Sequence, residues 1–295
     1  MAGVAVVTGT GRGFGLEIAR RLSGRGYTVL CTDVDGQAAA AGAEQVGGFG
    51  MQLDVRDPEA HRTAARAATE RGPLEVWVNN AGVLRTVKAW EHSDDEVRQL
   101  VEVNLLGVIY GSRAAVEAMR TGPGSNRHII NLASLSALTP VPGLAVYAAT
   151  KHGVLGFTSS LQGDLQLAGI PITVHAVCPD AADTQMLRER SADEDAAIIW
   201  AAPRLLAPEE VADRAVRLLD SKELVAVIPR WGAGWRAAPR CSAGTHFTAR
   251  TRFADRASAR GRAQARFSTA TKGTTWPRRR PSPRPRPARH RRSRS

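Results

Sequence analysis

Short runs of apolar, often β-branched residues alternate with longer amphipathic segments along most of the chain. A short apolar run between turn residues is typical of a strand buried on both faces of a parallel sheet. Such runs predict strands over residues 4–7, 27–32, 49–53, 75–78, 127–132, 172–177 and 224–228. Apolar residues at helical spacing predict intervening helices over residues 14–23, 37–45, 58–71, 94–119, 145–167 and 208–219. This alternation predicts a doubly wound parallel sheet of the α/β class, with helices on both faces.

The periodic pattern ends near Trp235, and the composition then changes. Residues 236–295 hold 18 of the 40 Lys and Arg residues but only one of the 28 Asp and Glu residues. The net charge of +12 therefore comes from this segment, whereas residues 1–235 hold 22 basic and 27 acidic residues, a net charge of −5. We expect one α/β domain over residues 1–235, and a disordered basic tail over residues 236–295 that cannot bury enough apolar surface to fold.

The tail has three open interpretations. A basic arm can bind nucleic acid through its phosphates, although this one has few aromatic residues for base stacking. It can equally be an extension without a partner. The abrupt change of composition is also what a shifted reading frame in a GC-rich gene would produce.

A glycine-rich loop, Thr8-Gly9-Thr10-Gly11-Arg12-Gly13-Phe14-Gly15, joins the first predicted strand to the first predicted helix. Glycine allows positive φ and a close approach of the backbone to a ligand. The N-terminus of the following helix offers free N–H groups to a pyrophosphate. The loop therefore predicts a dinucleotide site, although Phe14 stands where G-x-G-x-x-G would have its third glycine.

Tyr147 and Lys151 lie four residues apart in a segment with a helical pattern. Side chains at this spacing share one helix face. A nearby ammonium favours a phenolate and lowers the pKa of the phenol, which is otherwise about 10. The pair is therefore a candidate general acid and base, although the same spacing also occurs on ordinary exposed helices.

The whole set of motifs resembles the short-chain dehydrogenase/reductase family, in its compact single-domain branch. Besides the glycine loop and Tyr147-x-x-x-Lys151, the set includes Ser134, Asn104 and Asn79-Asn80-Ala81-Gly82, in the family's order and spacing. The resemblance implies an NAD(P)-dependent oxidoreductase that interconverts a secondary alcohol and a ketone by hydride transfer. It implies that Tyr147 exchanges a proton with the substrate, Ser134 orients the substrate oxygen, Lys151 lowers the pKa of the tyrosine and holds the nicotinamide ribose, and Asn104 anchors a water relay.

The resemblance also implies a cofactor site. In the family, residues at the positions of Asp54 and Val55 lie at the adenine, and Thr184 contacts the carboxamide. For Asp54 the alternative is a helix cap, for which Asp57 is the better candidate. The full expected set is Gly9, Gly11, Arg12, Gly13, Phe14, Gly15, Asp33, Asp54, Val55, Asn80, Ala81, Gly82, Tyr147, Lys151, Pro179 and Thr184.

Asp33 and Arg12 bear on the choice of cofactor. Asp33 ends the second predicted strand, where a carboxylate accepts hydrogen bonds from the adenosine ribose and repels a 2′-phosphate. Some relatives that use NADP carry a basic residue at the position of Arg12. Because the repulsion by Asp33 is direct, we expect NAD to be preferred, with NADP as the alternative.

Two further features concern the substrate. Asp180 follows Pro179 where the family has a glycine, so its side chain is expected to crowd the nicotinamide or change the charge beside it. Residues 185–206 cover the substrate in relatives and here contain several large apolar side chains. They predict a hydrophobic alcohol or ketone, unless these side chains only pack on the domain.

Composition narrows the setting. The three cysteines are far apart without metal-ligand or redox spacing, and the first residues run directly into a strand rather than a signal peptide. No apolar run approaches the roughly 20 residues that span a bilayer. We expect a cytoplasmic protein without a metal, forming a homo-oligomer as relatives do. The alternatives are a non-catalytic dinucleotide-binding regulator whose tail binds nucleic acid and, less favoured for so short a chain, a sugar epimerase.

Overall fold

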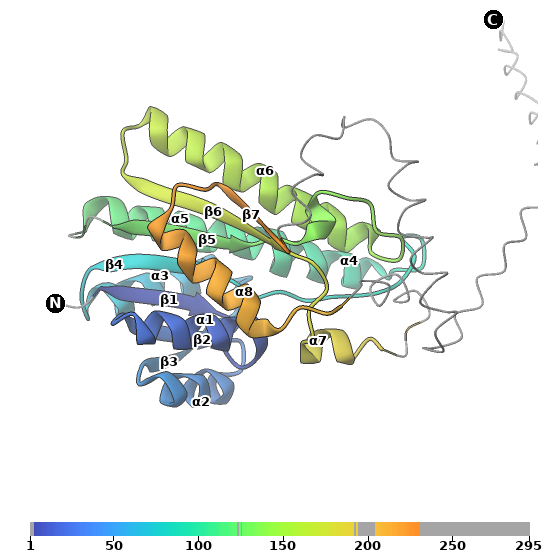
Figure 1. Cartoon of the computed structure of the whole chain (residues 1–295), viewed down its shortest axis with the longest axis horizontal. Coiled ribbons are helices and arrows are strands. Elements are labelled where there is room, and N and C mark those ends of the chain that lie inside the picture. The colour runs from blue at the N-terminus through green and yellow to red at the C-terminus, as the bar shows by residue number, and fades with distance from the viewer. Residues whose placement is uncertain (1–2, 123, 125, 192, 194–203, 230–295) are drawn as a thin grey trace, which may run out of the picture.

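The computed structural model describes residues 3–122, 124, 126–191, 193 and 204–229. Seven parallel strands form a single sheet in the order β3-β2-β1-β4-β5-β6-β7 (Figure 1). The strands are β1 (Val4–Thr8), β2 (Thr28–Asp33), β3 (Phe49–Gln52), β4 (Leu74–Asn79), β5 (Arg127–Leu132), β6 (Ile172–Pro179) and β7 (Val225–Ile228). The strand order reverses between β1 and β4. β1 pairs in parallel with β2 on one side and with β4 on the other. Such a switch point opens a crevice at the carboxyl ends of the strands, where ligands bind in sheets of this kind.

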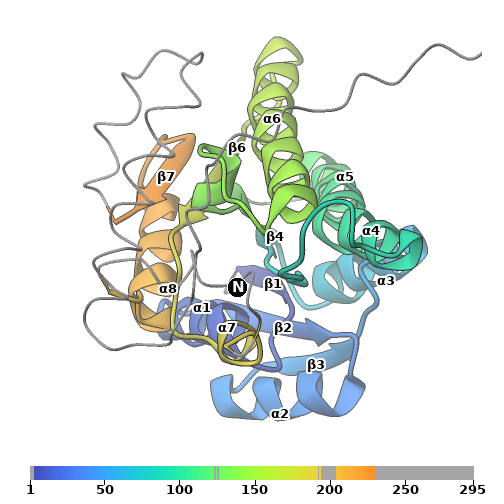
Figure 2. The ribbon, with the colours of Figure 1, turned by 90° about the vertical axis from the view of Figure 1, so that its right-hand side faces the viewer.

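Helices cover both faces of the sheet, as Figure 2 shows. They are α1 (Gly13–Gly24), α2 (Gly36–Val46), α3 (Pro58–Thr69), α4 (Asp94–Val101), α5 (Gly107–Thr121), α6 (Ala145–Leu167), α7 (Gln185–Arg188) and α8 (Pro208–Val216). One core cluster joins Ile18 of α1 and Val211 of α8 to the sheet, and a second joins Ala64 of α3 and Ala115 of α5 to its other face. Every residue of β1 is buried, as expected, whereas the residues of the edge strand β3 are half-buried or exposed.

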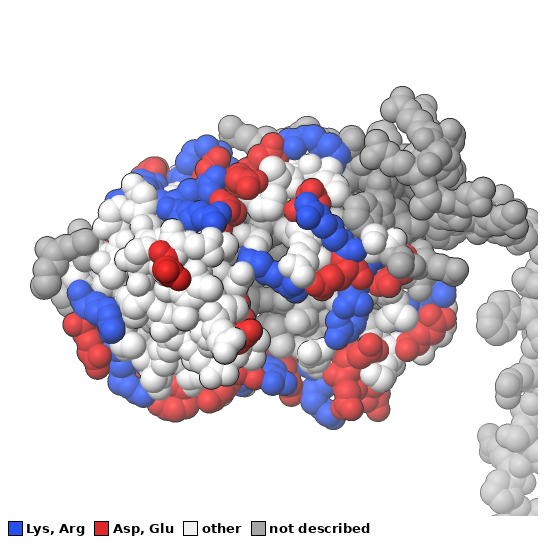
Figure 3. All heavy atoms as spheres, turned by 90° about the horizontal axis from the view of Figure 1, so that it is seen from below, with Lys and Arg blue, Asp and Glu red and all other residues white. Residues whose placement is uncertain are grey.

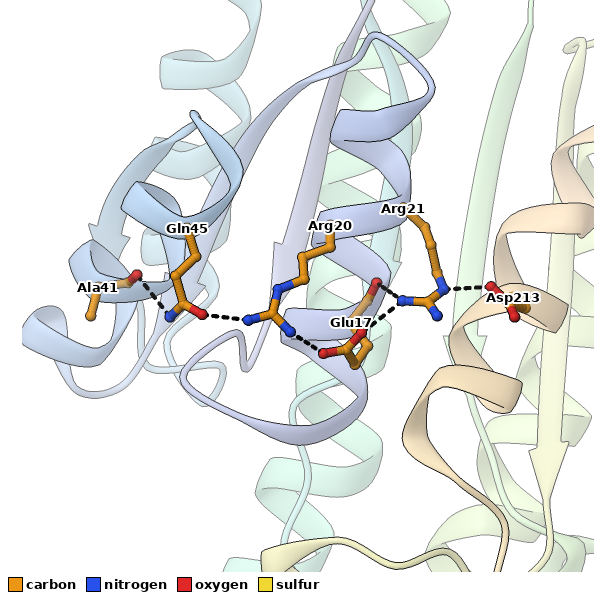
Figure 4. A network of polar contacts seen from close by, with 6 residues as sticks. All are labelled: Glu17, Arg20, Arg21, Ala41, Gln45 and Asp213. Carbon is orange, nitrogen blue, oxygen red and sulfur yellow. Dashed lines mark hydrogen bonds and ion pairs between the residues drawn. The ribbon is translucent and has the colours of Figure 1, made fainter.

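Polar contacts join α1 to its neighbours on either side (Figure 4). Arg21 donates from Nε to Asp213 of α8 at 2.5 Å and from Nη1 to Glu17 at 2.7 Å. Arg20 bridges the same Glu17 to Gln45 of α2. On the face seen in Figure 3, acidic and basic side chains lie beside one another, in keeping with the near-balanced charge of residues 1–235.

The doubly wound parallel sheet and all seven predicted strands are confirmed. The predicted helix over residues 94–119 is interrupted by a π-helical turn over Glu102–Leu106, because the buried Asn104 bonds to the backbone of a neighbouring loop. The predicted helix over residues 208–219 ends at Val216 and continues as a 3₁₀ turn over Arg217–Asp220. Asp57 caps α3, as expected, by accepting from Glu59 N at 2.8 Å.

Some expectations fall outside the described residues. These are the disordered state of residues 236–295, the domain boundary at residue 235, and half of the segment 185–206 expected to cover the substrate. Within the described part of the chain, no helix has the length and apolar character needed to cross a membrane.

Candidate active site

The glycine loop has the backbone that the sequence predicts. Gly9 and Gly13 adopt positive φ angles of 72° and 63°. A Cβ atom on Gly15 would lie 2.0 Å from Gly9 O, so a side chain cannot fit between the loop and α1. Asp35, Asp57 and Ser93 cap their helices, whereas Arg12 places no side-chain cap on α1. The first N–H groups of α1 therefore remain available for an anion such as a pyrophosphate.

Asn80 ties the end of β4 to this loop. Its Nδ2 donates to Thr8 O at 2.8 Å and to Gly9 O at 3.0 Å. In return, Thr8 Oγ1 accepts from the backbone N–H groups of Asn80 and Ala81, both at 3.0 Å. The two strands on either side of the switch point are thus held in register where a dinucleotide would cross them.

Asp33 and Arg12 lie at the outer edge of the loop. Asp33 Oδ2 accepts from Gly11 N at 2.9 Å, which leaves Oδ1 turned toward Asp35 N at 3.2 Å. The Arg12 guanidinium forms an ion pair with Glu189, with Nη1 and Oε1 2.9 Å apart. Phe14 is partly buried and packs against the core beneath α1.

Asn104 is fully buried in the π-helical turn and grips the loop that follows β4. Its Oδ1 accepts from Val83 N at 2.8 Å and its Nδ2 donates to Val83 O at 2.9 Å. A Cβ atom on Gly82 would lie 3.2 Å from Asn104 Oδ1 and 3.9 Å from Lys151 Nζ. Asn104, Gly82 and Lys151 therefore meet at one point of the crevice.

Ser134, Tyr147 and Lys151 come together at the carboxyl end of β5. Ser134 follows this strand, and its hydroxyl accepts from Ser136 N at 3.2 Å and forms a hydrogen bond with Tyr147. Lys151, one turn of α6 beyond Tyr147, is 4% exposed and donates to Leu132 O at 2.7 Å. Lys151 Nζ lies 5.6 Å from the centroid of the Tyr147 ring. Tyr147 itself is only partly buried, so a substrate can reach it.

The expected effect of Lys151 on the pKa of Tyr147 is wrong for this structure. Burial raises the pKa of Tyr147 to about 12, and the hydrogen bond with Ser134 lowers it only in part. Burial also lowers the pKa of Lys151 to about 8. The ammonium donates to Leu132 O rather than to the phenol oxygen, and burial dominates the pKa of Tyr147.

A buried apolar cluster, called here the apolar wall, packs against Tyr147. It consists of Leu84, Val141, Leu144 and Leu187, with Met186 and Tyr147 packed against it. Val87 N donates to Gly143 O at 3.0 Å, which joins two of the contributing loops. Of the large apolar side chains of residues 185–206 that the structure describes, Met186, Leu187 and Leu205 pack in this cluster, whereas Leu206 lies in the core shared with α1 and α8.

The other residues that were expected at the cofactor or beside it make the following contacts. The Asp54 carboxylate, expected at the adenine, forms an ion pair with Arg56 at 2.6 Å, which lowers its pKa. Val55 is buried and its carbonyl accepts from His61. Thr184 caps α7, and its methyl group lies 3.9 Å from a Cβ built on Gly13. Asp180 follows Pro179 at the end of β6, and its Oδ1 accepts from Ala181 N at 2.9 Å.

Sequence reasoning missed three groups. Glu189 was not singled out, because its partner Arg12 is 177 residues away. Asn131 was not singled out either: its Oδ1 accepts from Asn79 Nδ2 at 2.8 Å, and Asn79 Oδ1 accepts from Trp77 Nε1. Burial raises the pKa of Cys178 to about 12, and its surroundings include Ser134 and Lys151. Of these three groups, only Asn131 could have been found from the sequence, because it is a polar residue inside an apolar strand.

Comparisons with known proteins identify the family of the chain. A sequence model described as short chain dehydrogenase matches residues 3–195. The chain belongs to the short-chain dehydrogenase family. Members of this family are oxidoreductases, and two of the solved structures that the chain resembles contain NAD and NADPH.

Among the curated relatives, 3-oxoacyl-[acyl-carrier-protein] reductase FabG of Escherichia coli is 35% identical over 227 residues, which cover 75% of this chain and 90% of the relative. The 1-deoxy-11-beta-hydroxypentalenate dehydrogenase of Streptomyces exfoliatus is 35% identical over 218 residues, 67% of this chain and 78% of that one. A short-chain dehydrogenase/reductase from Burkholderia phymatum, solved with NAD, superposes with a TM-score of 0.72 at 26% identity, over 80% of this chain and 92% of that one. An actinorhodin polyketide ketoreductase variant solved with NADPH gives 0.69 at 32% identity, over 77% and 95%.

Proposed function

We propose that this short-chain dehydrogenase reduces an apolar ketone to a secondary alcohol, with Tyr147 as the proton donor. The observation that carries the proposal is the meeting of Tyr147, Ser134 and Lys151 at the end of β5, beside the glycine loop and below an apolar wall. The positive φ of Gly9 and Gly13 and the uncapped start of α1 fit a dinucleotide. When bound, the reduced nicotinamide would supply the hydride.

The side chains divide the remaining work. Ser134 donates a hydrogen bond to the substrate oxygen and fixes its position beside the phenol. Tyr147 transfers its proton to that oxygen as the carbonyl carbon gains the hydride, and the product is a secondary alcohol. With a pKa raised to about 12, the phenol is fully protonated at neutral pH, as a proton donor must be. This supports the direction of ketone reduction.

Lys151 and Asn104 support the donor. As the phenolate forms, the positive charge of the Lys151 ammonium stabilises that anion. Asn104 holds Val83 and, through it, the wall of the crevice beside Gly82. We propose that the water relay expected at Asn104 restores the tyrosine proton, since both side-chain atoms of Asn104 already bond to Val83 and leave its second carbonyl lone pair for a water.

For the cofactor we propose NAD in preference to NADP, because the Asp33 carboxylate lies against the glycine loop at Gly11. For the substrate we propose a 3-oxo compound, since the names of two relatives describe a 3-oxoacyl reductase and a polyketide ketoreductase. The apolar wall of Leu84, Val141 and Leu144 supports an alkyl or cyclic body beside the reacting carbonyl.

The test is the oxidation of NADH by the full chain with 3-oxoacyl thioesters and cyclic ketones, followed by absorbance. Tyr147→Phe removes only the hydroxyl, and it should lower kcat by at least about 10²-fold while NADH binding persists. Tyr110→Phe, a change of the same kind on α5, is the matched control and should retain the rate. Full turnover by Tyr147→Phe would refute the assignment of the proton donor.

A further inference from the structure

The glycine loop is joined to the end of α7 by one ion pair. Arg12 Nη1 lies 2.9 Å from Glu189 Oε1, and Gln185 Nε2 donates to the same Oε1 at 3.0 Å. Both charged side chains are about half exposed, at 53% and 45%. An exposed pair of this kind adds little to folding stability. The position of the ion pair is therefore a better guide to its role than its contribution to stability.

The pair lies beside the carboxylate that would meet the adenosine ribose. Asp33 Oδ2 accepts from Gly11 N at 2.9 Å, and Gly11 directly precedes Arg12. A phosphate on the ribose next to Asp33 would thus lie beside the backbone of Arg12. Arg12 is the sole basic residue of the loop Thr8–Gly15. A guanidinium binds phosphate strongly through two parallel N–H donors.

Glu189 changes what Arg12 can do. In the ion pair the guanidinium donates to a carboxylate, so a phosphate must compete with Glu189 for the same donors. With Glu189 present, the three charges of Asp33, Arg12 and Glu189 sum to −1, which repels a dianionic phosphate. Without it, the sum is zero and the guanidinium is free to turn.

We propose that Glu189 determines the cofactor preference, by holding Arg12 away from the ribose and so excluding the 2′-phosphate of NADP. This inference rests on the proposed function. Asp33 repels the phosphate, and Glu189 withholds the cation that would compensate for that repulsion. Gln185 fixes the Glu189 carboxylate in the orientation that the pair requires.

The experiment compares the binding of NAD⁺ and NADP⁺ by calorimetry on the full chain and on Glu189→Gln. The variant should bind NADP⁺ about tenfold more tightly, which corresponds to one regained charged hydrogen bond, with NAD⁺ affinity changed less than about twofold. Adding Arg12→Ala to Glu189→Gln should abolish the gain. Glu59→Gln is the matched control, because Glu59 also forms exposed ion pairs with arginines, but on α3.

Each outcome decides between the two proposals. An unchanged ratio of the two affinities, or an equal change in Glu59→Gln, would overturn the role of Glu189 and leave the enzyme assignment intact. An equal loss of affinity for both cofactors would show that Glu189 only supports the loop. Binding of neither cofactor by the unsubstituted chain would instead overturn the proposed function, and this inference with it.

Discussion

Asn104 binds both backbone polar groups of Val83, accepting from its N–H at 2.8 Å and donating to its C=O at 2.9 Å. The π-helical turn over Glu102–Leu106 contains Asn104, and the side chain is fully buried. The π-helical turn therefore positions the Asn104 side chain, which fixes the loop that contains Val83 in the crevice.

Replacing Asn104 should be costly in a way that depends on the substituent. Asn104→Ala leaves Val83 without its partner and should lower the free energy of unfolding by about 1–3 kcal/mol. Asn104→Asp keeps the acceptor but sets a carboxylate oxygen against Val83 O, so it should cost more than alanine near pH 7. Urea unfolding of both variants measures this difference. Equal stabilities for the two variants would contradict a role for the Nδ2 donor.

The glycine loop makes a sharp steric prediction. A Cβ atom on Gly15 would lie 2.0 Å from Gly9 O and 2.5 Å from Asn80 Nδ2, whereas one on Gly156 of α6 would meet nothing within 4 Å. Gly15→Ala should therefore lower the melting temperature and abolish NAD binding. Gly156→Ala should raise stability by about 0.5–1 kcal/mol, because it only restricts the unfolded chain. A Gly15→Ala variant that binds NAD normally would show that the loop adopts another conformation.

Most of the fold could be predicted because it depends on local pattern. Six of the seven strands are apolar runs that are mostly buried, and only the edge strand β3 alternates between half-buried and exposed residues. Their alternation with amphipathic helices leaves few possible arrangements. The glycine loop, Asn80, Ser134, Tyr147 and Lys151 could be placed because each lies at a strand end or on one helix face.

The remainder depends on contacts between distant residues or on burial. The pair of Arg12 and Glu189 spans 177 positions, and nothing in either local sequence specifies it. The π-helical turn arises from the tertiary bond between Asn104 and Val83. The raised pKa of Tyr147 was not predicted, because the desolvation of the phenol, which the hydrogen bond with Ser134 offsets only in part, is a property of the folded site.

The pH dependence of catalysis should follow Lys151. Its pKa is lowered to about 8 by burial, so the ammonium is present below that pH and is lost above it. Ketone reduction, measured as kcat/KM, should therefore be level near pH 6–7 and fall above about pH 8, while Tyr147, with a pKa near 12, stays protonated throughout. In Lys151→Arg the guanidinium keeps its charge, so the fall should disappear if the variant is active.

A persistent fall above pH 8 in active Lys151→Arg would assign that limb to another group. Loss of all activity would be informative through binding: retained NADH affinity would indicate that the ammonium itself is required, and lost affinity that the lysine holds the cofactor.

A buried histidine pair should make the fold sensitive to acid. His128 Nδ1 and His175 Nε2 lie 2.9 Å apart in stacked rings, and His175 Nδ1 donates to Glu223 O. Burial and the neighbouring ring lower the pKa of His128 to about 4, and burial lowers that of His175. A proton added at His175 Nε2 would set two N–H groups against each other across this contact, whereas His128 Nε2 lies outside it, 2.9 Å from Asn126 Oδ1.

The sign of the effect follows from these pKa values. In the unfolded chain both histidines bind protons near pH 6.5, whereas in the folded protein they stay neutral to lower pH. The unfolded state therefore holds more protons between about pH 6.5 and pH 4, so stability is full above this window and falls through it as the pH falls. His128 alone should account for about 2–3 kcal/mol of that loss.

Chemical unfolding at pH 7.5 and pH 5 measures this slope. His128→Phe removes one titrating ring while retaining a stacked aromatic, and it should make stability less dependent on pH than in the unsubstituted chain, although it costs the hydrogen bond to His175. His152→Phe is the control, because His152 lies on α6 apart from this pair and bonds only locally to Ala148 O. An unchanged slope in His128→Phe would mean that carboxylates, including Asp220 beside His128, govern acid unfolding.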